Sequence, residues 1–140
     1  MSHARTLRPG RIADLALAAL LVATGTAQAG DTTAAAQLAH WQAQAGAPGQ
    51  AERGQAFFTA RHGNELSCAS CHGAPPTAAA RHASTGKPIA ALAPAFNAER
   101  FTDTAKVDKW FKRNCKDVLS RECSAAEKAD LLAYLVGLRP

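Results

Sequence analysis

Cys68-Ala69-Ser70-Cys71-His72 is the stretch that decides the fold of this 140-residue chain. Two cysteines separated by two residues and followed at once by histidine form the C-x-x-C-H pattern of covalent c-type haem attachment. One turn of backbone presents both thiols to the two vinyl groups on one edge of a haem, so that two thioether bonds form. His72 is then placed to bind the iron as its proximal ligand, and we expect a backbone carbonyl to hold its other ring nitrogen. The sequence therefore predicts one covalent haem c.

Two other kinds of site use closely spaced cysteines. A thioredoxin-like redox pair follows a strand in a βαβ unit, and the sequence has no strand pattern. A zinc site needs four ligands at close spacing, whereas Cys115 and Cys123 lie over forty residues further along the chain. The motif therefore favours haem over both alternatives.

Residues 1–29 have the pattern of a secretory signal peptide. A basic start is followed by an apolar run over residues 12–23 and by Ala27-Gln28-Ala29, an A-x-A cleavage site. The apolar run is too short to span a bilayer. We therefore expect cleavage after Ala29, a mature cytochrome domain of residues 30–140 and a periplasmic location, because bacteria attach haem c after export. The basic residues at the start are Arg5, Arg8 and Arg11.

The charge of the mature part is modest. The whole chain has 16 basic and 11 acidic side chains, and without the three signal-segment arginines and Asp14 there remain 13 and 10, a net charge of +3. We see no basic patch interleaved with aromatic residues, so we predict no nucleic-acid binding. Basic residues cluster between Lys106 and Lys116, which indicates either a solvated helix face or a docking face for an acidic redox partner.

Helical periodicity runs through the mature part and predicts an all-α domain. Asp31 or Thr32 is the expected cap of the first helix. Gly54 and Phe58 share one face of the second helix. The last helix opens with the capping box Ser124-Ala125-Ala126-Glu127, and we expect it to cross the second helix at that face. The expected helices cover residues 32–45, 51–61, about 103–114 and 125–138.

Residues 73–94 follow the haem motif and are rich in proline, glycine and alanine, which predicts a long irregular loop. A flat cofactor can serve as the core against which such a loop packs. We expect Ile89, Leu92 and Phe96 to lie against it.

One face of the third helix combines three apolar side chains with an amide. Val107, Trp110, Phe111 and Asn114 follow one another at i, i+3, i+4 and i+7. The pattern predicts that Asn114 is buried, and an unpaired buried amide costs about 1–3 kcal/mol. Asn114 therefore needs a partner.

The sixth ligand of the iron is not methionine, because the only methionine is Met1, which leaves with the signal peptide. His82 in the loop after the haem motif is the histidine candidate, and Lys87 in the same loop is a second one. We expect His40 on a helix surface and His62 at a helix end, where its charge complements the helix dipole.

Cys115 and Cys123 are the remaining cysteines. In an exported chain, two leftover cysteines favour a disulfide over free thiols. Closing this nine-residue loop would stabilise the fold by about 2.5 kcal/mol in the chain-entropy model. The bridge would pin the chain just after Asn114 to the start of the last helix. The alternative is a cysteine thiolate on the iron.

These features resemble class I c-type cytochromes, in which a helix with glycine and an aromatic residue precedes C-x-x-C-H and a C-terminal helix crosses it. A closer resemblance is to the sphaeroides haem protein (SHP) family. It rests on segments spread over nearly the whole mature chain: Gly30-Asp31-Thr32, Ala51-Glu52-Arg53-Gly54, Thr85-Gly86-Lys87, Leu92-Ala93-Pro94, Arg100-Phe101-Thr102-Asp103, Arg113-Asn114-Cys115, Arg121-Glu122-Cys123 and Glu127-Lys128-Ala129-Asp130.

The resemblance implies a class I cytochrome c fold of about four helices around one covalently bound haem c. It implies that Asn114 is the distal iron ligand and that Cys115 and Cys123 form a disulfide. It further implies binding of small diatomic ligands such as oxygen and nitric oxide in the reduced state, electron supply from a dihaem cytochrome c, and association with a membrane b-type cytochrome.

The chemistry of an amide ligand is consistent with that role. An amide oxygen is a hard, neutral donor that suits ferric iron and binds ferrous iron poorly. Reduction is therefore expected to release Asn114 and to leave its N–H₂ group beside the open position as a donor. A plain electron-transfer cytochrome ligated by His82 or a lysine is the competing interpretation, and turnover of a bound diatomic ligand is a third. We see no distal acid–base pair for peroxidase chemistry.

Overall fold

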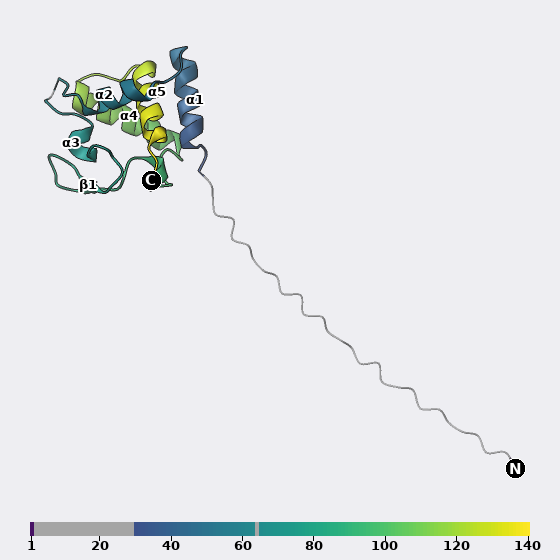
Figure 1. Ribbon diagram of the computed structural model, residues 1–140. Helices are drawn as coiled ribbons and strands as arrows, with labels where there is room; N and C mark the ends of the chain where they lie inside the picture. Colours follow the sequence, from purple (N-terminus) through teal and green to yellow (C-terminus); the bar gives the residue numbers. More distant parts are fainter. Residues whose placement is uncertain (2–29, 64) are drawn as a thin grey trace.

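The computed structural model describes Met1, residues 30–63 and residues 65–140. Apart from Met1, the predicted signal peptide of residues 1–29 lies outside the described residues. Figure 1 shows α2 and α5 crossing near the centre of the molecule, with α1 beside α5 and α4 behind them. The described elements are α1 (Ala34–Ala45), α2 (Ala51–Thr59), α3 (Ala69–His72), β1 (Ala80–Arg81), β2 (Pro88–Ile89), the 3-10 turn η1 (Pro94–Phe96), α4 (Thr104–Leu119) and α5 (Ala125–Gly137).

The predicted all-α class is correct, with one helix more than expected among the described residues. The additional helix is α3, the single turn formed by the haem motif itself. No helix in the described ranges has both the length and the apolar character needed to cross a membrane. The second helix, α2, ends at Thr59, two residues before its predicted end at Arg61.

Helix α1 begins after Thr33, whose side-chain oxygen accepts a hydrogen bond of 3.1 Å from the backbone N–H three residues further on. The predicted caps are therefore wrong, and both have other partners. The Asp31 carboxylate accepts a hydrogen bond of 2.8 Å from the backbone N–H of Thr104, at the start of α4. The Thr32 hydroxyl accepts one of 3.2 Å from the Gln37 side chain. The segment before α1 thus ties the beginnings of two helices together.

Helices α2 and α5 cross at Gly54. A Cβ atom added there would overlap the carbonyl oxygen of Asp130, so only glycine lets the two backbones approach this closely. Phe58, one turn further on, is only 1% exposed. The predicted crossing of the last helix over the Gly54/Phe58 face is confirmed. Three buried side chains of α5 pack with Phe58: Leu131, Tyr134 and Leu135.

Asp130 fixes this crossing by hydrogen bonds from α5 to the start of α2. Its carboxylate accepts hydrogen bonds of 2.8 Å from both Nε and Nη2 of Arg53, and one of 2.7 Å from the backbone N–H of Gln50. Gln50 is the N-cap of α2 and its own side chain makes no capping bond, so Asp130 supplies the cap from the neighbouring helix. Burial raises the pKa of Asp130, but the hydrogen bonds from Arg53 and Gln50 outweigh it and hold the pKa below its usual range.

Helix α4 begins after Asp103, whose carboxylate accepts a hydrogen bond of 2.9 Å from the backbone N–H of Lys106. It continues past the predicted end at Asn114 as far as Leu119. The reason is that buried side chains continue at helical spacing through Cys115 and Val118. Cys115 therefore lies within a helix, whereas the predicted helix end at Asn114 puts it in the connection between two helices.

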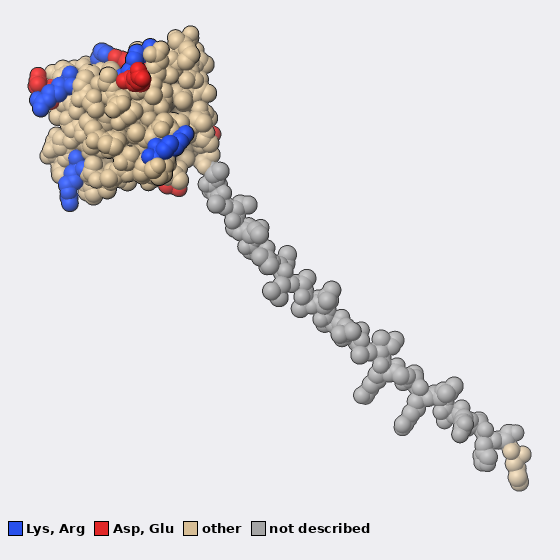
Figure 2. All heavy atoms as spheres, viewed as in Figure 1, with Lys and Arg blue, Asp and Glu red and all other residues tan. Residues whose placement is uncertain are grey.

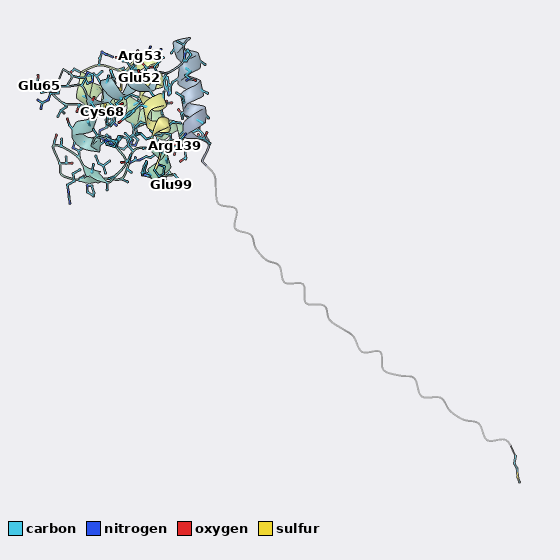
Figure 3. The ribbon with its side chains drawn as sticks, viewed as in Figure 1. Glu52, Arg53, Glu65, Cys68, Glu99 and Arg139 are labelled. Carbon is cyan, nitrogen blue, oxygen red and sulfur yellow. A yellow bond between two sulfur atoms is a disulfide. The ribbon has the colours of Figure 1, made fainter. Side chains whose placement is uncertain are left out.

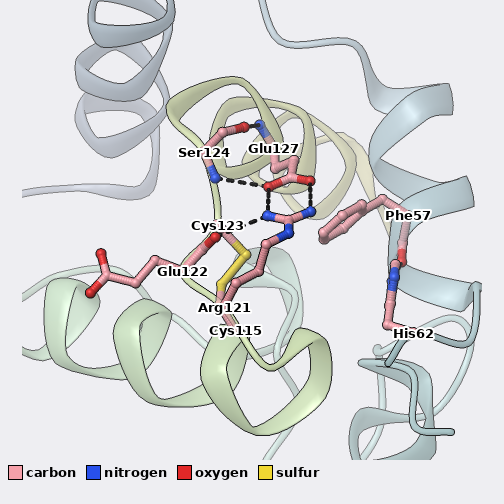
Figure 4. The surroundings of a disulfide bond; sticks show 8 residues. All are labelled: Phe57, His62, Cys115, Arg121, Glu122, Cys123, Ser124 and Glu127. Atoms are coloured by element: carbon pink, nitrogen blue, oxygen red, sulfur yellow. Dashed lines mark hydrogen bonds and ion pairs between the residues drawn. A yellow bond between two sulfur atoms is a disulfide. The ribbon is translucent and has the colours of Figure 1, made fainter. Parts of the chain in front are cut away.

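Cys115 forms a disulfide with Cys123, which immediately precedes the cap of α5. The predicted capping box of Ser124 and Glu127 is confirmed, with both of its hydrogen bonds present. Arg121 adds a fork of two hydrogen bonds, 2.8 and 2.6 Å long, to the Glu127 carboxylate. Figure 4 shows this fork and the cap beside the bridge. The last turns of α4 and the first turn of α5 are thus joined covalently and by hydrogen bonds.

A short antiparallel ribbon interrupts the loop after the haem motif, so the expectation of no strand was wrong. Ala80 pairs with Ile89, and Arg81 pairs with Pro88. The Arg81 guanidinium also closes the connecting turn with a hydrogen bond of 3.0 Å to the carbonyl oxygen of Gly86. Strands of two residues are too short to leave the alternating pattern by which strands are recognised in a sequence.

Replacing Gly54 by alanine should test the close helix crossing. We expect Gly54→Ala to lower the free energy of unfolding by about 1–3 kcal/mol, because the methyl group must push the α5 backbone away. Gly137→Ala is the matched control, since a Cβ atom on this helical glycine meets nothing within 4 Å. It should be neutral or stabilise by up to about 1 kcal/mol. Denaturant unfolding measures both, and equal effects would contradict the crossing.

Candidate functional site

The haem motif folds as the single turn α3, and two serines hold that turn. The backbone N–H of Ser67 donates to the hydroxyl of Ser70 at 3.0 Å, and the N–H of Ser70 donates to the hydroxyl of Ser67 at 3.1 Å. The N–H of His72 donates to the carbonyl of Cys68 at 3.1 Å. Ser67 is buried, and its role was not expected from the sequence. The sequence does carry a signal for this role, because Ser67 lies three positions before a second hydroxyl residue. At that spacing two side chains can each accept a hydrogen bond from the other residue's backbone N–H.

A cavity of about 1030 Å³ opens beside α3. Its walls come from the haem motif, the β1–β2 ribbon, the segment before α4, one face of α4, and α5. In Figure 3, Cys68 lies toward the interior, away from Arg53 at the upper edge of the molecule. The structure brings all six predicted site residues to this one cavity: Cys68, Cys71, His72, Asn114, Cys115 and Cys123.

The face of α4 identified from the sequence forms one wall of the cavity. Val107, Trp110, Phe111 and Asn114 all line it. Val107 is buried, whereas Trp110 is 46% exposed and Asn114 is exposed as well. The prediction that Asn114 is buried is therefore wrong, because its part of the helix faces the cavity and not another helix. Its placement on the same face as the three apolar residues is correct.

The loop residues expected to face the cofactor divide into two groups. Ile89 and Leu92 line the cavity. Phe96 is not among the lining residues and is 38% exposed. Phe96 is the last residue of the 3-10 turn η1, which packs against α5.

His72 has the protonation state of a metal ligand. Burial, and after it the charges of Arg100 and His82, lower the pKa of His72 to about 4, so the imidazole is neutral at pH 7 and keeps a lone pair for a metal. Its Nδ1 atom is buried and has no hydrogen-bond partner among the described residues, so the expected carbonyl acceptor is not there.

The two cysteines of the motif take part in no disulfide among the described residues. Burial raises the pKa of Cys68 to about 11, whereas a dithiol redox centre needs a thiolate. No group of three or more histidine, cysteine, aspartate or glutamate side chains suited to a metal occurs among the described residues, which argues against zinc. A large cavity with a neutral histidine and two adjacent thiols fits haem c. Cys68 and Cys71 would hold the vinyl edge, and His72 would hold the iron.

His82 also lines the cavity, on the side of α3. Its Nδ1 atom accepts hydrogen bonds of 3.3 and 3.4 Å from the backbone N–H groups of Ser84 and Thr85. The backbone N–H of Ala83 donates to Sγ of Cys71 at 3.3 Å. The turn that carries His82 is therefore anchored to the haem motif, whereas Asn114 belongs to a different wall.

The other two histidines of the mature part do not line the cavity. His40 is exposed on α1, as predicted. His62 lies beyond the end of α2 and its Nε2 donates to the carbonyl oxygen of Phe57 at 2.9 Å, so it satisfies a carbonyl of the last turn. Lys87 is exposed and does line the cavity.

Comparison with known proteins gives matches over most of the mature part. Residues 44–135 match a family described as a domain of unknown function, DUF1924. The chain is 50% identical over 118 residues to the cytochrome c-type protein SHP of Cereibacter sphaeroides. This match covers 81% of the chain and 91% of SHP.

Two solved structures extend the comparison to the fold. Oxidised SHP, described as an oxygen-binding cytochrome c, superimposes with a TM-score of 0.72 and 48% identity and covers 78% of this chain and 100% of the SHP chain. The solution structure of cytochrome c'' from Methylophilus methylotrophus, described as giving insight into haem-ligand detachment, has a TM-score of 0.66 and 35% identity and covers 76% and 94%. These matches confirm the predicted cytochrome c fold class.

Mass spectrometry of the mature protein should find one covalent haem. The expected mass is that of residues 30–140 plus one haem, less the two hydrogens of a disulfide, because Cys68 and Cys71 add across two vinyl groups. The band should stain for haem on a denaturing gel. Cys68→Ala, which leaves one thioether, should change the absorption spectrum, and Cys68→Ala with Cys71→Ala should abolish covalent retention. Extraction of the haem by acidified acetone from the unaltered protein would contradict the assignment.

Proposed function

The chain belongs to the SHP-like family of c-type cytochromes that carries the DUF1924 description, and from this membership we propose its function. It is a periplasmic monohaem cytochrome that accepts electrons. In the reduced state it releases Asn114 and binds a small diatomic ligand, oxygen or nitric oxide.

The observation that carries this proposal is the position of Asn114. Asn114 lies on the α4 wall of the cavity that also contains His72, in a mature chain without methionine. The thioether ligand usual in electron carriers is therefore missing, and an amide faces the cavity. When bound, the haem supplies a redox-active iron whose axial positions take side chains or small ligands.

The two axial residues have different tasks. The neutral imidazole of His72 is a ligand in both oxidation states. The Asn114 amide oxygen is a harder donor and prefers the ferric state, so it leaves on reduction. Its N–H₂ group then donates a hydrogen bond to the incoming diatomic ligand. Cys115, next to Asn114 and disulfide-bonded to Cys123, limits how far this part of α4 moves.

The relatives support both halves of the proposal. SHP is described as an oxygen-binding cytochrome c, and the solution structure of cytochrome c'' is described in terms of haem-ligand detachment. Oxygen binding and haem-ligand detachment are thus described for proteins that share this fold at 48% and 35% identity.

The competing function is plain electron transfer with a permanent sixth ligand. His82 is the observation in its favour, because it lines the same cavity. Its Nδ1 already accepts two backbone hydrogen bonds, so only Nε2 is left for a metal. Lys87 is the second candidate ligand for that interpretation.

We further propose that electrons arrive from an acidic partner, such as a dihaem cytochrome c, and that a membrane b-type cytochrome takes part. Charged side chains are few and of both signs on the face shown in Figure 2, whereas one helix, α4, carries a run of basic residues near the cavity. Trp110 lies among them, with Lys109 and Arg113 at 5.8 and 5.5 Å from its ring centre. This basic α4 face consists of Lys106, Lys109, Lys112, Arg113 and Lys116.

The variants Asn114→Ala and His82→Ala distinguish the two functions. We expect Asn114→Ala to change the ferric absorption and electron paramagnetic resonance spectra, because the distal oxygen is lost. The reduced variant should still bind carbon monoxide and should lose bound oxygen about tenfold faster, corresponding to one hydrogen bond of about 1.4 kcal/mol. His82→Ala should alter neither property. The reverse pattern would establish a bis-histidine electron carrier.

The basic α4 face should govern reduction by an acidic redox partner. Lys109→Glu with Lys112→Glu should slow second-order reduction by such a partner at low ionic strength, because steering of charged proteins falls when the attracting charges are reversed. The difference from the unaltered protein should shrink as salt is added. Arg61→Glu with Arg139→Glu makes the same charge change at two exposed residues that do not line the cavity, and this control should have little effect. If the test and control variants slow reduction equally, the net charge of the protein and not the basic α4 face is the cause.

A further inference from the structure

Arg100 is a charged side chain held rigidly at the cavity. It lies between η1 and α4 and lines the cavity together with the haem motif. Its Nε donates to the carbonyl oxygen of Ala91 at 2.8 Å, and its Nη2 donates to that of Ala90 at 2.6 Å. The Asn97 side chain donates to the same Ala91 carbonyl at 3.2 Å. The guanidinium is therefore fixed against one segment of backbone.

No carboxylate neutralises this guanidinium within the described ranges. Arg53 and Arg121 each pair with an acid at 2.8 and 2.6 Å, whereas no carboxylate of a described residue lies within ion-pair distance of Arg100. Its two hydrogen bonds go to neutral carbonyl groups, which leave the full positive charge in place. Burial lowers the pKa of Arg100, which shows that its surroundings disfavour the charge. A half-buried charge without a counter-charge is costly, so a partner of opposite sign is missing from the chain itself.

The unused part of the guanidinium has the geometry of a carboxylate receptor. Of its five N–H groups, one on Nε and one on Nη2 are occupied. Both hydrogens of Nη1 and the second hydrogen of Nη2 remain, and these adjacent nitrogens form the planar fork that binds a carboxylate through two parallel bonds.

We propose that Arg100 receives a propionate carboxylate of the covalently bound haem. Haem carries two propionates, and they are its only anionic substituents. Arg100 is better suited than the other lysines and arginines that line the cavity. Two of them are paired with acids, Lys106 with Asp103 at 3.2 Å and Arg113 with Asp117 at 3.8 Å, and Lys87 and Lys116 are exposed. Arg100 thereby orients the cofactor and offsets a negative charge close to the iron. The inference rests on the covalent haem and not on gas binding.

Arg100→Gln in the haem-loaded protein tests this role. The vibrational bands of the propionates in the resonance Raman spectrum should shift, because the carboxylate loses a charged donor. The reduction potential should fall, because an unneutralised propionate favours the ferric state. One unit charge at about 10 Å in a medium of effective dielectric constant about 20 changes the ferrous-to-ferric ratio at a fixed potential by about tenfold.

Two further variants separate this role from a structural one. Arg81→Gln is the matched control, because Arg81 also donates to a backbone carbonyl, at 3.0 Å, but does not line the cavity, and it should alter neither readout. Arg100→Lys keeps the charge and loses the fork, so it should shift the propionate bands while the potential stays near that of the unaltered protein. If Arg100→Gln lowers the melting temperature and changes neither the propionate bands nor the potential, Arg100 only holds residues 90–91 in place. If Arg100→Gln does not fold, Arg100→Lys decides, and unchanged propionate bands in that variant lead to the same conclusion. Carbon monoxide binding tests the gas-binding function separately.

Discussion

The close approach of α2 and α5 at Gly54 is the constraint on which the rest of the structure depends. Asp130 bridges the two helices there, and it caps α2 from a position 80 residues further along the chain. Phe58 lies one turn beyond the crossing, with its ring centre 5.6 Å from that of Tyr134 and 6.4 Å from that of His72. Because the chain passes from α2 into the haem motif, the crossing also determines where α3 and the cavity lie.

Helix α4 is attached in a different way. Close backbone contacts with the other helices are few, and bonds near its two ends hold it, together with the packing of Phe111 against the core. The Asp31 carboxylate accepts a hydrogen bond from the backbone N–H of Thr104, the first residue of α4, and the bridge from Cys115 to Cys123 fixes its later turns to α5. The middle of the helix is left to serve as a cavity wall. Asn114 immediately precedes the bridged cysteine, so the proposed release on reduction would take place by rotation of its side chain more easily than by a shift of the helix.

The parts that the sequence predicted are those with local signals. The C-x-x-C-H spacing, the Ser124–Glu127 capping box and the glycine four residues before Phe58 each identify their role within one or two turns of chain. The parts that it missed depend on distant partners. Neither the capping of α2 by Asp130 nor the contact of Arg100 with a backbone segment ten residues earlier leaves a periodic trace. The exposure of Asn114 was missed for a related reason, since helical periodicity shows that a face is shared but not whether it meets a helix or a cavity.

The proposed functions of Arg100 and Asn114 respond to the same electron in different ways. Reduction of the haem lowers the net charge of the site by one, and the positive charge of the Arg100 guanidinium favours that change. Asn114 is neutral and has no electrostatic preference of that kind, so its proposed bond to the iron would weaken because ferrous iron is the softer metal. The two residues also lie in separate elements, Arg100 before α4 and Asn114 in its interior. A substitution at Arg100 can therefore change the reduction potential without changing which oxidation state of the iron keeps Asn114 as its proposed ligand. A substitution at Asn114 can change the release of that ligand while the charge near the cofactor stays the same.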